Sequence, residues 1–279
     1  MVIGKKYKYY INLILAMAKK DYLINSKYPL STVMSLFDVL ISYLLISLTA
    51  FFIGKSFGHH SSFSASMNAF LLSGLIIYQF FDVAMNGLVY GIIVEKNLGT
   101  LNRNFASPAP KVLLLSGIVV YSFILALIRI AILLIAAKLL FGVVFFVSWQ
   151  AFIFGGIIAL CVMIISSGYG FMGAGITVST EDPALYLFLM QRPFVIFTGV
   201  FYSIMVLPMF LKLISYMIPI TYGIDLFRHL TLEHATFIPW KLEVLIISLS
   251  VVFFPLMGIL AFKKIEKSFL KKGTLNMFE

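Results

Sequence analysis

Long apolar stretches, separated by short polar connections, run through almost the whole chain. The six main stretches occupy residues 31–54, 67–94, 112–137, 149–178, 193–207 and 242–262. A membrane's hydrocarbon core is about 30 Å thick and is crossed by about 20 helical residues, and all of these stretches except the fifth reach that length. The pattern predicts an all-α integral membrane protein in which six transmembrane helices form a bundle between residues 31 and 262.

A further apolar region follows the fifth stretch but is broken in its middle. Pro219 divides it into residues 209–218 and 220–232, and each piece is too short to cross a bilayer. Short apolar helices of this kind are typical of re-entrant segments, whose backbone is satisfied within the protein. We therefore expect a re-entrant helical hairpin before the last span, with a single kinked seventh span as the alternative. Its candidate functional residues are Pro208, Pro219, Thr221, Tyr222, Asp225 and Arg228.

The hairpin is expected at the outer side of the membrane, where its polar side chains would face the interface. Asp225 and Arg228 are three residues apart, so they could cap the second short helix together. His229 and His234 lie nearby, but they have no cysteine or other clear third ligand, and we predict no metal site.

The residues before the first span have a different periodicity. Lys5, Lys8, Asn12 and Lys19 share one face of a helix, while tyrosine, isoleucine and methionine side chains fall on the other. An amphipathic helix of this kind is typical of the membrane surface. We expect an interfacial helix over residues 5–23, and a helix that docks on a partner protein is the alternative.

Charge sets the expected orientation. The 279 residues carry a net charge of +10, although only 11% of them are charged and the mean hydropathy is +1.04. Most basic residues lie beside the spans on one side, in segments 5–27, 96–111 and 263–272, and Arg192 opens the fifth span. Basic loops face the cytoplasm, so the charge does not indicate nucleic-acid binding. We expect one transmembrane domain over residues 1–279 in the cell membrane, with both termini, including the tail 263–279, in the cytoplasm.

Three charged residues within the predicted spans are candidates for a functional role. Asp82 in the second span and Arg129 in the third lie at comparable depths, and a charge within the membrane usually pairs or faces water. We expect these two to form an ion pair, acting as a packing clamp or as part of a translocation path. Asp38 lies near the inner end of the first span and can reach interfacial water without a partner.

Two segments that contain glycine resemble nucleotide-binding motifs, but neither meets the requirements of its motif. Gly54-Lys55-Ser56 resembles the end of a phosphate-binding loop, yet the position that must be glycine is Thr49. A G-x-G-x-x-G pattern at 168–173 lies within an apolar span, where small residues serve close helix packing. ATP-driven work by this chain would need a second polypeptide.

Two segments carry a family resemblance. The first is E-K-N-L-G-T-L at 95–101 followed by F-A-S-P at 105–108, and the second is G-V-F-Y at 199–202 followed by I-P-I-T-Y-G-I-D-L-F-R at 218–228. Together they resemble the type-2 ABC exporter permeases, the membrane subunits that pair with a separate ATPase. Asn102 departs from the pattern, because many relatives carry an acidic residue there.

The resemblance implies a permease subunit, not itself an enzyme, that works as a homodimer or as a heterodimer with a similar chain. ATP and Mg would be bound by the partner ATPase and no cofactor by this chain, whose other contacts would be membrane lipids. Residues implied in coupling to the ATPase are Glu95, Gly99, Thr100, Leu101, Phe105 and Pro108, with Leu101 and Phe105 forming an apolar knob.

The implied cargo is a drug or another small amphipathic molecule that is moved outward. A polysaccharide or lipid-linked glycan is the alternative cargo. An ion-coupled secondary transporter, using Asp38 or Asp82, and a membrane anchor without transport are other possible classes.

Overall fold

The computed structural model describes residues 2–27, 29–56, 61–101, 103, 109–143, 148–180 and 183–271. Regular structure in these residues is helical, without strands, which confirms the all-α fold class. The elements are α1 (Val2–Lys27), α2 (Pro29–Ser56), α3 (Ser61–Asn97), α5 (Lys111–Phe141), α6 (Trp149–Ser179), α7 (Pro183–Phe197), the 3₁₀ turn η1 (Ile204–Val206), α8 (Met209–Met217), α9 (Pro219–Leu232) and α10 (Trp240–Lys271).

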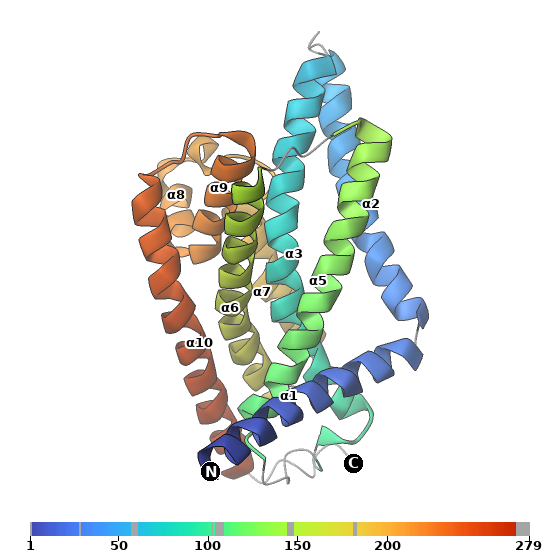
Figure 1. Ribbon diagram of the computed structural model, residues 1–279, viewed down its shortest axis with the longest axis vertical. Helices are drawn as coiled ribbons and strands as arrows, with labels where there is room; N and C mark the ends of the chain where they lie inside the picture. The colour runs from blue at the N-terminus through green and yellow to red at the C-terminus, as the bar shows by residue number, and fades with distance from the viewer. Residues whose placement is uncertain are drawn as a thin grey trace.

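The helix α1 lies across one end of a bundle formed by the long helices (Figure 1). It packs mainly on α5. The contact is close, since Gly117 of α5 has no side chain, and a Cβ atom added there would lie only 2.7 Å from the carbonyl oxygen of Ile14. A helix is present where the interfacial helix was expected, and it is continuous from Val2 to Lys27. α10 ends at the same end of the bundle as α1, whereas α8 and α9 lie near the opposite end (Figure 1).

Five helices are long and apolar enough to cross a membrane, namely α2, α3, α5, α6 and α10. The broken apolar region forms the bent pair α8 and α9, whose axes differ by 92°. The bend falls at Ile218, directly before Pro219, because proline begins a helix well but lacks the N–H that would continue the preceding one. The expected break at Pro219 is confirmed, and the two apolar pieces form a bent helix pair.

The expected fifth span forms a helix that is too short to be counted among these five, and its sequence-based boundaries are wrong. Its helix, α7, comprises Pro183–Phe197 and not residues 193–207, and Arg192 lies within it. Pro183 suits the first helical turn, and Gly199, with φ of +72°, follows the helix end in the left-handed conformation that glycine tolerates. Hydropathy placed the start too late because Gln191 and Arg192 interrupt the apolar run, and it placed the end too late because apolar residues continue past the helix into η1.

The core is built around α3, which packs against α2, α5, α6 and α9. Its side chains Ile77, Phe81 and Met85 are fully buried. α6 approaches α3 closely, since a Cβ atom on Gly170 would lie 3.0 Å from the carbonyl oxygen of Ala84. Much of the surface of α2 and α10 is exposed and apolar, as expected for helices that face lipid.

Candidate functional site

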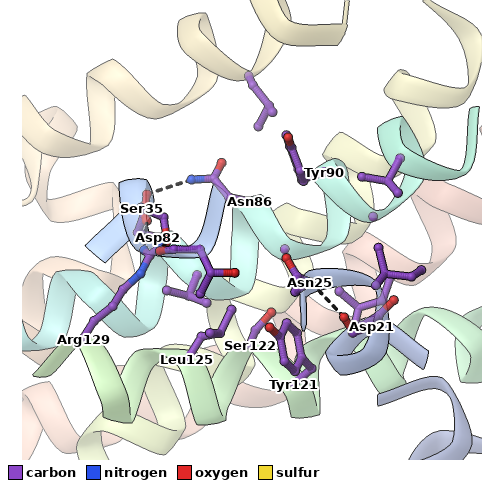
Figure 2. A pocket seen from close by; sticks show the side chains of 18 of the residues that line it. Asp21, Asn25, Ser35, Asp82, Asn86, Tyr90, Tyr121, Ser122, Leu125 and Arg129 are labelled. Carbon is purple, nitrogen blue, oxygen red and sulfur yellow. Dashed lines mark hydrogen bonds and ion pairs between the residues drawn. The ribbon is translucent and has the colours of Figure 1, made fainter. Parts of the chain in front are cut away.

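A cavity of about 480 Å³ opens between α1, α2, α3, α5 and α7. Its longest wall is α3, where Asp82, Asn86 and Tyr90 are spaced by four residues and so lie along one helix face (Figure 2). Glu95 lies at the end of this wall nearest α1, about 20 Å along the helix from Asp82. The cavity therefore reaches from the surface helix into the middle of the bundle.

Asp82 is the centre of a polar cluster inside the bundle. Its Oδ2 accepts a hydrogen bond from Arg129 Nη1 at 3.0 Å, so the structure brings this sequence-predicted pair together. Its Oδ1 accepts from Asn86 Nδ2 at 2.8 Å and from Gln191 Nε2 at 3.1 Å. Arg129 Nη1 also donates to Gln79 Oε1 at 3.4 Å. Three helices, α3, α5 and α7, thus converge on one carboxylate.

The amide side chains of this cluster were missed by the sequence reasoning. A signal existed for two of them, because Gln79 and Asn86 lie three and four residues from Asp82 on the same helix face. No such signal existed for Gln191, which comes from a helix more than 100 residues further along.

At the α1 end, the last turn of α3 is attached to two other helices. Lys20 of α1 forms an ion pair and a hydrogen bond with Glu95. Lys96 Nζ donates to the carbonyl oxygens of Thr177 at 3.1 Å and Thr180 at 2.9 Å, at the end of α6. A displacement of this turn of α3 would therefore be transmitted to both α1 and α6.

The segment implied in ATPase coupling begins at this turn. Gly99 has φ of +64°, and its N–H and that of Thr100 bond back to the carbonyl oxygens of Lys96 and Glu95, which ends α3 in the manner of a glycine cap. Glu95 is buried and faces Lys20, so its side chain is not presented outward.

The expected apolar knob of Leu101 and Phe105 needs correction. Leu101 is 6% exposed and belongs to the core cluster of Leu88, Ile92 and Leu115, because the turn at Gly99 directs the chain back against the bundle. Phe105 and Pro108 lie outside the described residues. The exposed apolar side chain next to the turn is Leu98, at 52% exposure.

In the hairpin, the prolines lie at the helix starts. Pro208 directly precedes α8, and Pro219 is the first residue of α9. Thr221 and Tyr222 are buried, and the Tyr222 hydroxyl donates to the carbonyl oxygen of Tyr216 at 2.8 Å, which ties α9 to α8.

Arg228 was expected at an exposed interface, paired with Asp225, and the structure contradicts this. It is 3% exposed, and it donates to the carbonyl oxygens of Gly199 at 2.8 Å and Val200 at 2.7 Å. Its guanidinium also lies 3.6 Å above the ring of Phe70. Asp225 instead accepts from the backbone N–H of Phe237 at 3.0 Å. The backbone carbonyls exposed by the turn after α7 supply acceptors that sequence spacing could not reveal.

Asp38 lies on an exposed face of α2, and it forms no ion pair with another residue that the structure describes.

A family model, described as "ABC-2 type transporter", matches residues 12–232. The match runs from within α1 to the end of α9 and contains both segments that resemble the type-2 ABC permeases. The chain belongs to the ABC-2 type transporter family. A comparison with curated protein sequences finds no significant match.

This ABC-2 family protein is therefore a multi-pass membrane protein and a permease subunit of an ABC transporter. Permeases of this family normally pair with an ATPase subunit.

Proposed function

We propose that this permease exports a small amphipathic molecule, using ATP hydrolysed by a partner subunit. The observation that carries the proposal is the cavity between α1, α2, α3, α5 and α7. Its volume of about 480 Å³ falls within the range of roughly 300–1,000 Å³ that is usual for small-molecule sites. Polar side chains line it beside apolar ones such as Val83, Ile118 and Leu125, which suits a molecule with both characters.

The alternatives fit the site less well. A polysaccharide exporter needs a continuous path for a chain of sugars, whereas this cavity has the size of a single small molecule. An ion-coupled transporter needs an intramembrane carboxylate that is free to bind its ion. Asp82 already accepts hydrogen bonds from Arg129, Asn86 and Gln191, and Asp38 lies on an exposed face of α2 outside the cavity.

The proposed assembly is a dimer of this chain, or of this chain with a similar one, in the cell membrane. Both termini and α1 lie on the cytoplasmic side, as the basic segments favour. Two ATPase subunits carry ATP and Mg and contact residues 95–108, where Leu98 offers an exposed apolar side chain. Closure of the ATPases would move the end of α3, and with it the cavity wall at α1 through Lys20 and the end of α6 through Lys96.

The test is ATP hydrolysis by the permease–ATPase complex reconstituted in liposomes, with drugs, lipids and glycans as candidate stimulants. Uptake of each stimulant into vesicles whose ATPases face outward then measures transport. We expect small amphipathic compounds to stimulate hydrolysis and to accumulate inside. A complex with a hydrolysis-deficient ATPase is the matched control and should accumulate nothing. Stimulation and uptake confined to glycans would replace this proposal with the polysaccharide alternative.

A further inference from the structure

The charges that line the cavity do not balance. Its charged side chains are Lys20, Asp21, Asp82, Glu95 and Arg129, which are three acids and two bases. Lys20 pairs with Glu95, and Arg129 pairs with Asp82. Asp21 is the remaining acid, and it forms no ion pair with another residue of the described part of the chain. The cavity therefore has an excess of one negative charge, located at Asp21.

One oxygen of the half-buried Asp21 carboxylate has no hydrogen-bond partner among the described residues. This oxygen, Oδ2, is buried. Asn25, one turn further along α1, donates to the backbone oxygen of Asp21 at 2.9 Å and not to its carboxylate (Figure 2). A carboxylate oxygen that is buried without a hydrogen bond is costly, so a cationic ligand that donated a hydrogen bond to the Asp21 carboxylate would supply the partner that the described residues do not.

The surroundings of Asp21 suit the rest of an amphipathic cation. Tyr121 lies beside Asp21 in the cavity, and Tyr90 lies further along the α3 wall (Figure 2). Aromatic faces attract organic cations at close range. Apolar side chains, among them Ile24 and Ile118, line the same space.

The same geometry disfavours an anion. The two basic groups of the cavity, Lys20 and Arg129, already face carboxylates. An anionic ligand would have to separate one of these pairs or approach the unpaired Asp21.

We propose that the cavity binds an amphipathic organic cation, with its ammonium group on Asp21 and its apolar part along the wall formed by α3 and α5. That this ligand is the exported cargo rests on the proposed function. The binding site itself does not, because it requires only the permease in its folded form.

The experiment uses the permease–ATPase complex in nanodiscs and the fluorescent primary amine dansylcadaverine. Its N-acetylated derivative keeps the apolar part but has no charge. We expect the amine to bind wild-type protein about tenfold or more tightly than the acetylated probe, as the gain of one charge-assisted hydrogen bond predicts. Empty nanodiscs correct for partition into lipid. Equal affinity of the two probes for wild-type protein would overturn the proposal without any variant.

Variants then locate the site. Asp21→Asn should weaken amine binding by about tenfold and leave the acetylated probe unaffected. Glu233→Gln removes an exposed carboxylate at the opposite end of the bundle and should bind like wild type. If Asp21→Asn binds the amine as tightly as wild type, the assignment of the cation to Asp21 is wrong.

The proposed function and the proposed binding site at Asp21 can be rejected independently of each other. Asp21-dependent amine binding without ATP-driven uptake would keep this site and reject export. Export of amphipathic compounds that is indifferent to their charge and to Asp21 would keep the function and reject this site.

Discussion

Gly168 of α6 and Gly258 of α10 meet backbone to backbone. A Cβ atom on Gly258 would lie 2.1 Å from the carbonyl oxygen of Gly168, and one on Gly168 would lie 2.3 Å from the carbonyl oxygen of Phe254. Helices in lipid gain little from the hydrophobic effect between them, so such close approach supplies the packing that holds them together.

Adding a methyl group at this contact should separate the two helices. We expect Gly258→Ala to destabilise the protein by about 1–3 kcal/mol, because the new Cβ atom would meet backbone, which cannot rotate away. Gly156→Ala, on the same helix α6 as Gly168, is the matched control, since its Cβ atom would meet nothing within 4 Å. Thermal unfolding in detergent measures both. Equal midpoints for the two variants would contradict the close packing.

Asp82 and Arg129 should behave as one unit. Asp82→Asn or Arg129→Gln alone leaves a partly buried charge without its partner, and each should cost about 1.5–3 kcal/mol of stability. The double variant should lose clearly less than the sum of the two, because neither charge remains. Arg192→Gln, which removes an exposed arginine from α7, should cost little. Additive losses in this double-mutant cycle would show that the pair is not coupled.

Arg228 should resist replacement by lysine. Its guanidinium donates in different directions to the carbonyl oxygens of Gly199 and Val200 and to the Ser73 hydroxyl, and a single ammonium group cannot reproduce that fork. We expect Arg228→Lys to cost about 2–3 kcal/mol and to speed amide exchange in α9. Lys241→Arg, at an exposed position, is the control. Unchanged exchange in α9 would mean that Arg228 does not anchor it.

Both ends of the hairpin should lie on the outer side of the membrane. Single cysteines at Lys212 of α8 and Glu233 after α9, in a Cys161→Ala background, should both react with an impermeant thiol reagent added outside intact cells. The reason is that α8 and α9 are each too short to span, and they meet at a 92° bend. Labelling of one position from outside and the other only after permeabilisation would make the segment a span.

The docking of α1 should depend on pH through Asp21. Burial raises the pKa of its carboxyl to about 6, while Lys20 opposes the rise and Glu95 adds to it. Because this pKa is higher than in an unfolded chain, the docked helix is most stable below about pH 4 and loses stability as the pH rises to about 6. Amide exchange in α1, corrected for its intrinsic rate, should therefore quicken between those values. Asp21→Asn should remove this dependence, and a variant that retains it in full would assign the titration to another group.

Much of the membrane fold could be read from local pattern alone. A backbone in lipid must satisfy its own hydrogen bonds, and a long apolar stretch does so by forming a helix. This is the case for α2, α3, α5, α6 and α10. The break at Pro219 was equally local, because proline lacks the N–H that a continuing helix needs. The family resemblance rested on local segments too, and the family match contains both of them.

The features that only the tertiary structure could reveal involve residues that are far apart in the chain. The end of α7 is set by a glycine turn whose carbonyls are bonded by Arg228, almost 30 residues later. Lys20 pairs with Glu95 of another helix, and its neighbour Asp21 forms no ion pair with another described residue. Hydropathy and spacing describe one helix at a time, whereas a cavity, a buried arginine and an excess charge are properties of several helices packed together.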